Sequence, residues 1–503
     1  MNLRKKIYIL VLFFFCVVSA VAQELKRGQF SELSDSSFYR YSVRGFGMHS
    51  VFRPLPPFMK SEYDTTVTKP PEKASLNIIP LVSLIGGGDV ETSRSTSASF
   101  LGAALTFQAN QRWAAVLGYS AFLANTPRYL DSFISTREVL PGVGEVDSVA
   151  GIGTLSHYPF GFLGYQAGKH FYFEVGRGKQ FWGDGFRSLI ISDNAPAYPY
   201  VNAKIDIWKL RFNVLYTQFA QGADKKYSAS HGLSIDITKR LQLSAFEMVV
   251  WQARDSLNNR NFELHYLNPL IFYRPVEFAQ GSADNVLLGG GFKYKATKRL
   301  QFYGQFVLDE FLLSELRSRS GWWANKFGGQ LGYKWLHIEK GIFIQGEVNS
   351  VRPFTYSHGS PLQSWGHMFQ PIAHPLGANF AEFVQRFDWK LKKGFGVECV
   401  FVAYRQGLDS DMDEDLQVDN LGGDIFRSYK APFKEFGNKM FQGSRNDVFF
   451  SDITFYKNLS RGGFQVFVNH VYRKNFMDGL TNTDHLVLLG IRMSGLSRPN
   501  WIF

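Results

Sequence analysis

The sequence is poor in cysteine and has no long apolar run in its body. Of its two cysteines, Cys16 lies in an apolar stretch near the N-terminus, so Cys399 has no partner for an intramolecular disulfide. Beyond that stretch no 18 consecutive apolar residues occur, which excludes membrane-spanning helices. GxSxG, HExxH, CxxC and Walker-type motifs are also missing, so the common hydrolase, zinc and nucleotide sites have no basis here. We therefore expect no catalysis, no cofactor and no metal.

The N-terminus has the pattern of a secretory signal peptide. Residues 4–6 are basic, residues 7–18 are apolar, and residues 20–22 are small, which predicts a signal peptide over residues 1–22. Its removal lowers the formal charge from +12 to +9, because three basic residues and no acidic residue are lost. An exported chain of this size without disulfides needs another source of stability.

The composition indicates what that source is. Aromatic residues make up 16% of the chain, with 48 Phe and 23 Tyr, and glycine is also abundant. An exported, aromatic-rich and glycine-rich chain without spanning helices is typical of an outer-membrane β-barrel. The terminal Phe503 is typical of chains handed to the barrel-assembly machinery, which we expect as a partner during biogenesis.

Alternation of apolar and polar residues predicts eighteen strands. In residues 299–309, for example, Leu300, Phe302 and Phe306 share one face and Gln301 and Gln305 the other. Short turns on one side alternate with long loops on the other, the asymmetry between periplasm and exterior in outer-membrane barrels. The predicted strands are 75–88, 98–108, 111–123, 158–167, 170–178, 201–208, 209–219, 227–238, 240–251, 285–296, 299–311, 325–336, 341–351, 382–392, 395–406, 446–457, 463–475 and 484–495.

These patterns predict an all-β protein, a transmembrane antiparallel β-barrel of about 18 strands over residues 75–503. Residues 23–74 are proline-rich and alternate little, so we expect a short periplasmic N-terminal segment there. The chain is expected in the outer membrane with its long loops extracellular. Its Lys and Arg side chains are expected to face outer-membrane lipid, lipopolysaccharide or acidic glycans, and no nucleic acid.

One long loop is unusually rich in functional side chains. Residues 176–200 hold four glycines within ten positions, two prolines, and Trp, Asp, Arg and Asn, which predicts a loop presented by a rigid scaffold. Two interpretations stay open at this point. Its side chains bind a ligand, or the loop folds inward as a plug with Arg187 paired to Asp184, Asp193 or a carboxylate of the wall.

Two other polar groupings are less informative. Residues 409–413 have the opening spacing of a calcium loop, but Glu414 and Asn420 stand where that loop requires Gly and Glu, so a solvated acidic loop is favoured. His358, His367 and His374 share a loop without the spacing of a metal-ligand pair.

Three stretches carry a resemblance to a known family. Residues 182–189 (WGDGFRSL) with 192–196 (SDNAP) resemble the central motif of the Wzi-like capsule assembly family of outer-membrane proteins. Residues 268–270 with 273–277, and residues 374–380, resemble stretches of its Bacteroidetes-type members. The resemblance implies an eighteen-stranded barrel with periplasmic N-terminal helices, and a lectin-like role in holding capsular polysaccharide.

We therefore expect a non-catalytic surface protein that binds or anchors capsular or extracellular polysaccharide. The alternatives are an outer-membrane porin or nutrient channel, and an accessory to gliding or surface secretion. Aromatic planes, Asp and Asn oxygens and an Arg fork suit sugar rings, hydroxyls and carboxylates. The predicted contact residues are Trp182, Asp184, Arg187, Asp193, Asn194, Arg274, Glu277, His374 and Asn379.

Overall fold

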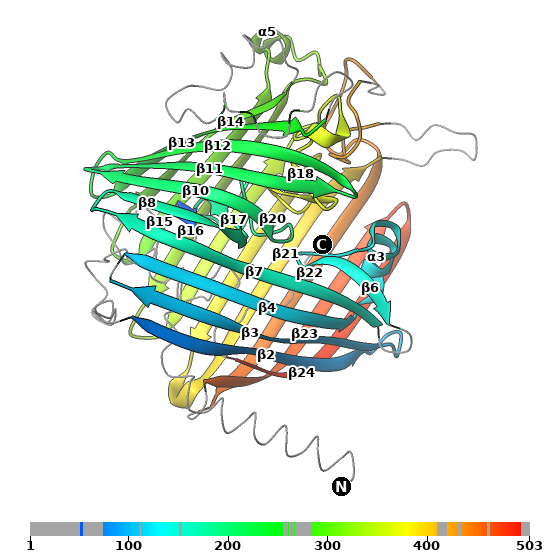
Figure 1. Ribbon diagram of the computed structural model, residues 1–503. Helices are drawn as coiled ribbons and strands as arrows, with labels where there is room; N and C mark the ends of the chain where they lie inside the picture. The colour runs from blue at the N-terminus through cyan, green and yellow to red at the C-terminus, as the bar shows by residue number, and fades with distance from the viewer. Residues whose placement is uncertain are drawn as a thin grey trace.

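Eighteen antiparallel strands close into one barrel (Figure 1). The computed structural model describes residues 51–53, 74–110, 112–149, 153–254, 260, 263, 266, 284–409, 420–430, 434–459 and 463–493. The strands of the wall are β2 (Ser75–Asp89), β3 (Ser95–Ala109), β4 (Trp113–Asn125), β7 (Gly153–Ala167), β8 (Phe171–Gly178), β10 (Tyr198–Ile207), β11 (Leu210–Gln221), β12 (Asp224–Asp236), β13 (Leu241–Gln252), β14 (Asn285–Lys295), β15 (Leu300–Glu310), β16 (Lys326–His337), β17 (Ile342–Val351), β20 (Phe380–Lys390), β21 (Phe395–Leu408), β22 (Ser444–Asn458), β23 (Phe464–Met477) and β24 (Leu480–Met493).

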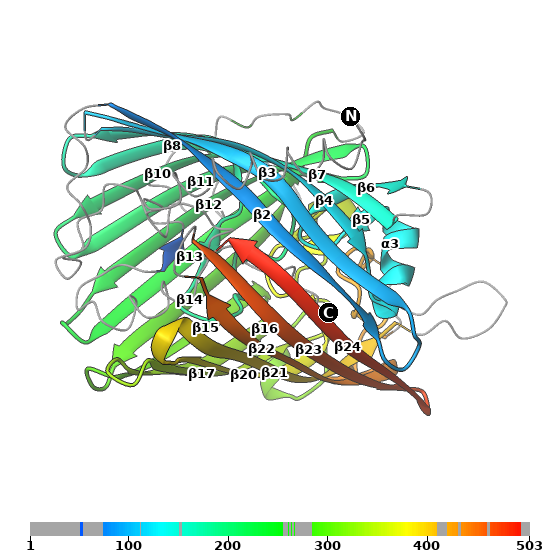
Figure 2. The same cartoon turned by 90° about the horizontal axis from the view of Figure 1, so that it is seen from below.

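The barrel closes where its first strand meets its last. β2 pairs with β24 from Ser83 opposite Arg492 to Asp89 opposite Leu486, and β2 pairs with β3 on its other edge. Figure 2 shows this seam, with the blue β2 beside the red β24. Closure leaves no unpaired sheet edge, which is what allows strands to cross a bilayer. The predicted fold and strand number are confirmed.

The two faces of the wall differ as the alternation predicts. Phe302, Phe306 and Trp389 point outward and are 42%, 52% and 40% exposed, whereas Gln301 and Gln305 are buried inside. Exposed Leu, Val, Ile and Phe side chains continue this apolar outer surface around the barrel. An apolar outer face on a closed barrel is the arrangement of an outer-membrane protein. No helix in the described part of the chain is long and apolar enough to cross a membrane.

The connections also follow the predicted asymmetry. Turns such as 208–209, 237–240 and 296–299 are short, whereas 126–152, 179–197, 311–325, 352–379 and 409–443 are long. The remaining elements lie mostly in the long loops: β5 (Val139–Leu140), β6 (Gly144–Val149), β9 (Phe181–Trp182), β18 (Gly366–His367), β19 (Gln370–Pro371), α3 (Asp131–Arg137), α5 (Leu313–Arg317), η1 (Arg128–Leu130) and η3 (Pro361–Gln363). One 3-10 turn, η4 (Lys392–Gly394), forms a short connection.

An apolar core lies inside the lumen. Loops 179–197 and 352–379 fold inward and meet: the Trp365 indole donates to the carbonyl of Ile190 at 2.6 Å, and the Tyr356 hydroxyl donates to that of Leu189 at 2.7 Å. All four side chains are fully buried against inward-facing residues of the wall. We call these two loops the plug. Such a core places close-packed side chains where an open pore holds water.

A piece of the N-terminal segment belongs to this core. β1 (Phe52–Arg53) pairs antiparallel with β9, and Phe52 packs edge-on against Trp182 with ring centroids 5.0 Å apart. Residues 51–53 were expected in the periplasm, but they lie among the buried residues of the lumen. The signal peptide and the rest of 23–74 lie outside the described residues, and their location stays a prediction.

Candidate functional site

The predicted loop 176–200 is a plug loop, and its glycines explain its path. Gly183 has φ +143°, a conformation that side chains disfavour, and a Cβ there would lie 2.5 Å from the Gln305 amide. At Gly185 a Cβ would lie 2.6 Å from the Glu347 carboxylate. The glycines therefore let the backbone approach polar side chains of the wall.

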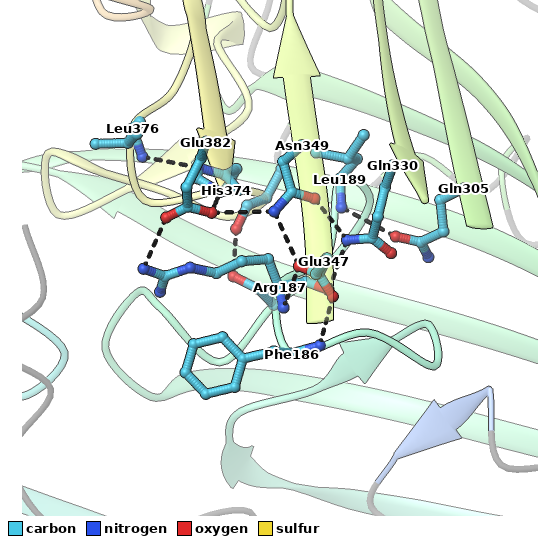
Figure 3. A network of polar contacts seen from close by, with 12 residues as sticks. Phe186, Arg187, Leu189, Gln305, Gln330, Glu347, Asn349, His374, Leu376 and Glu382 are labelled. Carbon is cyan, nitrogen blue, oxygen red and sulfur yellow. Dashed lines mark hydrogen bonds and ion pairs between the residues drawn. The ribbon is translucent and has the colours of Figure 1, made fainter. Parts of the chain in front are cut away.

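The Glu347 carboxylate of the wall accepts hydrogen bonds from the backbone of this loop. The amides of Phe186 and Arg187 donate to its two oxygens at 2.8 and 3.1 Å, and the Tyr303 hydroxyl donates at 2.8 Å. Figure 3 shows Glu347 beside Phe186 and Arg187 of the plug loop, with Asn349 on the same strand, β17. Residues two apart on a strand share a face, so this strand presents both side chains to the lumen.

A second wall carboxylate, Glu382 on β20, binds the side chains of both plug loops. The Arg187 guanidinium lies 3.1 Å from one of its oxygens, and His374 Nε2 lies 2.7 Å from the other. The Asn349 amide donates to Glu347 at 2.9 Å and to Glu382 at 3.0 Å, which joins the two carboxylates (Figure 3). We call these five residues, Arg187, Glu347, Asn349, His374 and Glu382, the anchor network.

The histidine of the anchor network is held as a neutral hydrogen-bond donor. The Leu376 amide donates to its Nδ1 at 3.2 Å, so the ring proton lies on Nε2, which faces Glu382. Burial is the main cause that lowers the pKa of His374 below its ordinary value, although Glu382 opposes this shift. The imidazole also stacks on Phe380, with ring centroids 4.2 Å apart.

The nine residues predicted for the site fall into separate places. Trp182 is fully buried against Phe52, and the Asp184 carboxylate lies 3.8 Å from Lys293 Nζ. Arg187 and His374 meet at Glu382, so the wall-carboxylate pairing considered for Arg187 is the geometry found. These four side chains lie inside the lumen.

Asn379 does not converge on the loop 176–200. Its side-chain amide donates to the carbonyls of Gly407 and Gln442, each at 2.9 Å, and its oxygen accepts from the Phe441 amide at 2.7 Å. It therefore joins the end of one long loop to the base of the next. Arg274 and Glu277 lie outside the described residues.

Asp193 and Asn194 lie elsewhere, at a junction of three long loops. Lys179 Nζ donates to the carbonyls of Gly142 and Asp193 at 2.7 and 3.0 Å. The backbone amide of Gly142 donates to Gln370 Oε1 at 2.7 Å. The side-chain amide of Asn194 donates to the carbonyl of Pro371 at 3.0 Å. Loops 126–152, 179–197 and 352–379 therefore meet here.

The same junction carries an aromatic ring beneath a cation. The Arg137 guanidinium carbon lies 4.8 Å from the Phe369 ring centroid, and Arg137 also lies 3.9 Å from Asp424, a residue of the next long loop. Arg137, Phe369 and Asp424 are partly exposed and Asp193 is exposed. We call seven residues the outer cluster: Arg137, Lys179, Asp193, Asn194, Phe369, Gln370 and Asp424.

Two buried polar atoms of the outer cluster have no hydrogen-bond partner among the described residues. These are Asn194 Oδ1, an acceptor, and Gln370 Nε2, a donor. Buried amide groups are normally satisfied, so these two atoms are exceptions to the hydrogen bonding of the cluster. Sequence reasoning missed Arg137, Phe369 and Gln370, because nothing in their local sequences shows that loops more than two hundred residues apart meet.

Metal binding has no geometric basis in what the structure describes. Within the described ranges, no three His, Cys, Asp or Glu side chains lie close enough together to hold an ion. His358, which the sequence placed among three loop histidines, donates a hydrogen bond from Nδ1 to Gln363 Oε1 at 2.8 Å.

Comparisons with known proteins give weak similarities. No protein-family model matches the chain, and no curated protein sequence matches it. Among solved structures, the barrel is similar to Escherichia coli Wzi, described as an outer-membrane protein involved in group 1 capsule assembly and a carbohydrate-binding β-barrel (TM-score 0.49, 12% identity, 82% of this chain and 84% of that one).

It is also similar to Pseudomonas aeruginosa OprD (TM-score 0.44, 9% identity, 84% and 96% of the two chains) and to Acinetobacter baumannii OccAB4 (TM-score 0.44, 8% identity, 84% and 97%). No statement about function follows from similarities at this level. Membership of the Wzi-like family, indicated by the sequence motifs, stays a prediction.

Proposed function

We propose that this protein is a non-catalytic, non-conducting outer-membrane protein that holds capsular or extracellular polysaccharide at its outer cluster. In this proposal the long loops face the cell exterior and the short turns face the periplasm. The observation that carries it is the junction of three loops over a plugged lumen, where a cation, an aromatic ring and a carboxylate lie together.

The plug favours a binder over a channel. A porin keeps a polar, water-filled passage through its lumen. Here the plug places Trp182, Ile190, Tyr356, Trp365 and Ile372 in the lumen with no exposed surface or almost none. Displacement of the loops would expose these side chains to water. Full burial of each large apolar side chain stabilises the folded state by about 1.5–3 kcal/mol, so this displacement is costly.

The outer cluster has the chemistry that a polysaccharide requires. The Phe369 ring provides an apolar plane for a sugar face, and Arg137 provides a fork for a uronic acid carboxylate or another acidic substituent. Asp193, which is exposed, offers carboxylate oxygens to sugar hydroxyl groups. The partial exposure of Arg137 and Phe369 leaves a chain molecule room to approach from outside.

The sequence-predicted residues divide between contact and support in this proposal. Asp193 contacts the polysaccharide, together with Arg274 and Glu277, which lie outside the described residues, while Asn194 joins two loops beneath it. Trp182, Asp184, Arg187, His374 and Asn379 hold the loops in place, since each is buried against other residues of the chain. The motif resemblance stated above supports the same ligand class.

Substitution of Phe369 and Arg137 tests the proposal. The double variant Phe369→Ala with Arg137→Gln should release polysaccharide from the cell surface while heat-modifiable migration and surface abundance stay at wild-type level. Phe436→Ala, which removes an exposed aromatic ring from another long loop, is the matched control and should retain polysaccharide. Unchanged retention in the double variant, or a loss in step with surface abundance, contradicts the proposal.

Two further measurements address the alternatives. Large, steady ion currents through the wild-type protein in planar bilayers would contradict the proposal and favour a porin. A deletion strain that keeps its polysaccharide but loses gliding or surface secretion would also contradict it, in favour of an accessory role. A deletion strain that releases polysaccharide into the medium and shows no nutrient phenotype supports the proposal.

A further inference from the structure

The outer surface of the wall has a groove near the long-loop end of β20–β23. The groove has a volume of about 550 Å³ and its floor is almost entirely apolar. Register explains its shape: Ala403 lies between Phe383 and the outward-facing Phe449 on the neighbouring strands, and Ala381 lies beside Arg405. These two small side chains beside the Phe383 and Phe449 rings leave a channel in the outer surface.

Cationic side chains lie at one part of the groove. Arg405 makes two parallel bonds to Asp447 at 2.7 and 3.1 Å, and Arg445 donates to the same carboxylate at 2.8 Å. Lys474, which is exposed, also lines the groove. Two arginines share one carboxylate, and together with Lys474 they leave an excess of positive charge beside an apolar channel.

The groove is an outward-facing feature of the barrel. Phe383, Phe449 and Phe476 are 46%, 44% and 45% exposed, and they belong to the same outer face as the apolar surface of the rest of the wall. Arg405 lies three residues before the end of β21, and Asp447 three residues after the start of β22, so the charges lie where long loop 409–443 leaves and rejoins the wall. The Phe441 ring from that loop lies 5.8 Å from the Arg405 guanidinium carbon.

We propose that this groove binds one molecule of a multiply acylated, phosphorylated glycolipid of the outer leaflet. The acyl chains lie along Ala381 and Ala403, where hydrocarbon meets hydrocarbon. The phosphate lies against Arg405, Arg445 and Lys474, because guanidinium groups bind phosphate through paired hydrogen bonds and an ammonium group adds a point charge. The leaflet follows from the orientation proposed above, since the charges lie at the long-loop end.

Native mass spectrometry of the full chain in detergent tests this site. The probes are bisphosphorylated hexa-acyl lipid A, phosphatidylglycerol and sodium phosphate. Wild-type protein should bind lipid A one to one, more tightly than phosphatidylglycerol, and sodium phosphate should not displace it. Arg405→Gln with Lys474→Gln should weaken lipid A binding roughly tenfold or more, since charge-assisted hydrogen bonds are lost. Ala403→Trp, which fills the channel but keeps the charges, should weaken it to a similar extent.

Matched controls lie elsewhere on the same barrel. Ala103→Trp enlarges an exposed alanine on β3, and Arg299→Gln removes the cation of an exposed ion pair with Glu339 at the short-turn end. Both should bind lipid A as the wild type does, with all variants first shown to be folded by heat-modifiable migration. Wild-type affinity in both groove variants would overturn the proposal. Wild-type protein that binds phosphatidylglycerol as tightly as lipid A, or that loses lipid A to sodium phosphate, would also overturn it. A dimer of the wild-type chain that Ala403→Trp abolishes would overturn it too, because the groove would then bind a second copy of the chain.

Discussion

Arg187 and Glu382 are 195 residues apart in the sequence, and their charged groups lie 3.1 Å apart inside the barrel. The pair joins a plug loop to the wall, and Glu382 receives His374 from the second plug loop as well. One carboxylate of the wall therefore holds two loops that are remote from each other in the chain.

Removal of the Arg187 charge should loosen the plug without unfolding the barrel. Arg187→Gln leaves Glu382 buried without its cation, a change that costs about 3–5 kcal/mol in buried pairs. We expect new protease cleavage within residues 179–197 and measurable ion conductance, while heat-modifiable migration persists. Arg299→Gln, in the exposed pair with Glu339, should change neither, because exposed pairs contribute about 0–1 kcal/mol. Wild-type protease resistance in Arg187→Gln would show that the pair does not anchor the loop.

A methyl group at position 185 should disturb the contact between the plug loop and Glu347. Gly185→Ala places Cβ 2.4 Å from the Arg187 carbonyl oxygen and 2.6 Å from the Glu347 carboxylate, so the plug loop has to shift. We expect a loss of about 1–3 kcal/mol in the free energy of unfolding, measured by urea titration in liposomes. Gly329→Ala, where no atom lies within 4 Å of the new Cβ, is the control. Equal stability of the two variants would contradict the described approach of backbone to wall.

A charge on the outer face should destabilise the membrane-inserted protein. Phe302 is 42% exposed on the apolar side of β15, so Phe302→Arg places a guanidinium group in hydrocarbon. Near the bilayer midplane this costs about 2–4 kcal/mol, measured by urea unfolding in liposomes. Phe302→Leu keeps the side chain apolar and should cost far less. A similar small effect of both substitutions would mean that this position does not face lipid.

Acid should release the second plug loop. Burial lowers the pKa of His358 to about 4 and that of His367 to about 3, and it lowers the pKa of His374 as well. An unfolded histidine titrates near 6.5, so the unfolded loop takes up protons first and the plug is fully stable only above about pH 6.5. For each histidine that is protonated in the unfolded loop but neutral in the plug, the stability of the plug falls by about 1.4 kcal/mol per pH unit below pH 6.5.

Hydrogen exchange of residues 352–379 measures this effect. We expect protection to fall progressively from pH 6.5 toward pH 4, after correction for the intrinsic pH dependence of exchange. His367→Asn and His358→Asn should flatten the profile. A flat profile in the wild-type protein would mean that these side chains are not held neutral.

The wall was predictable because its signal is local. Each strand alternates apolar and polar residues, and a short turn fixes its register with the next strand, so all eighteen segments were found. The predicted ends were less accurate: β24 begins at Leu480, whereas the prediction began at 484, and β7 begins at Gly153 instead of 158. At those ends the strands extend into polar sequence, such as Thr481 to Thr483, where alternation of apolar residues disappears.

The site was less predictable because it is built from remote contacts. The richness of loop 176–200 was a real signal, and the inward pairing of Arg187 with a wall carboxylate was one of the two interpretations considered. The partners Glu382 and Glu347 were visible only as polar positions on the inner faces of two strands. Nothing local indicated that Phe52 enters the lumen, or that Phe369 meets Arg137 from another loop. Such contacts depend on how loops of different hairpins fold together.

The position of β1 sets an order of events during assembly. The seam joins β2 to β24, the first and last strands of the wall, so it forms only after the whole chain has entered the sheet. β1 precedes β2 in the chain and pairs with β9 inside the ring. We expect residues 51–53 and the plug loops to gather inside before the ring closes, since later entry requires them to pass through an end of the finished barrel. In that order the barrel assembles around its contents, and a ring that closes early lacks the packing of Phe52 on Trp182.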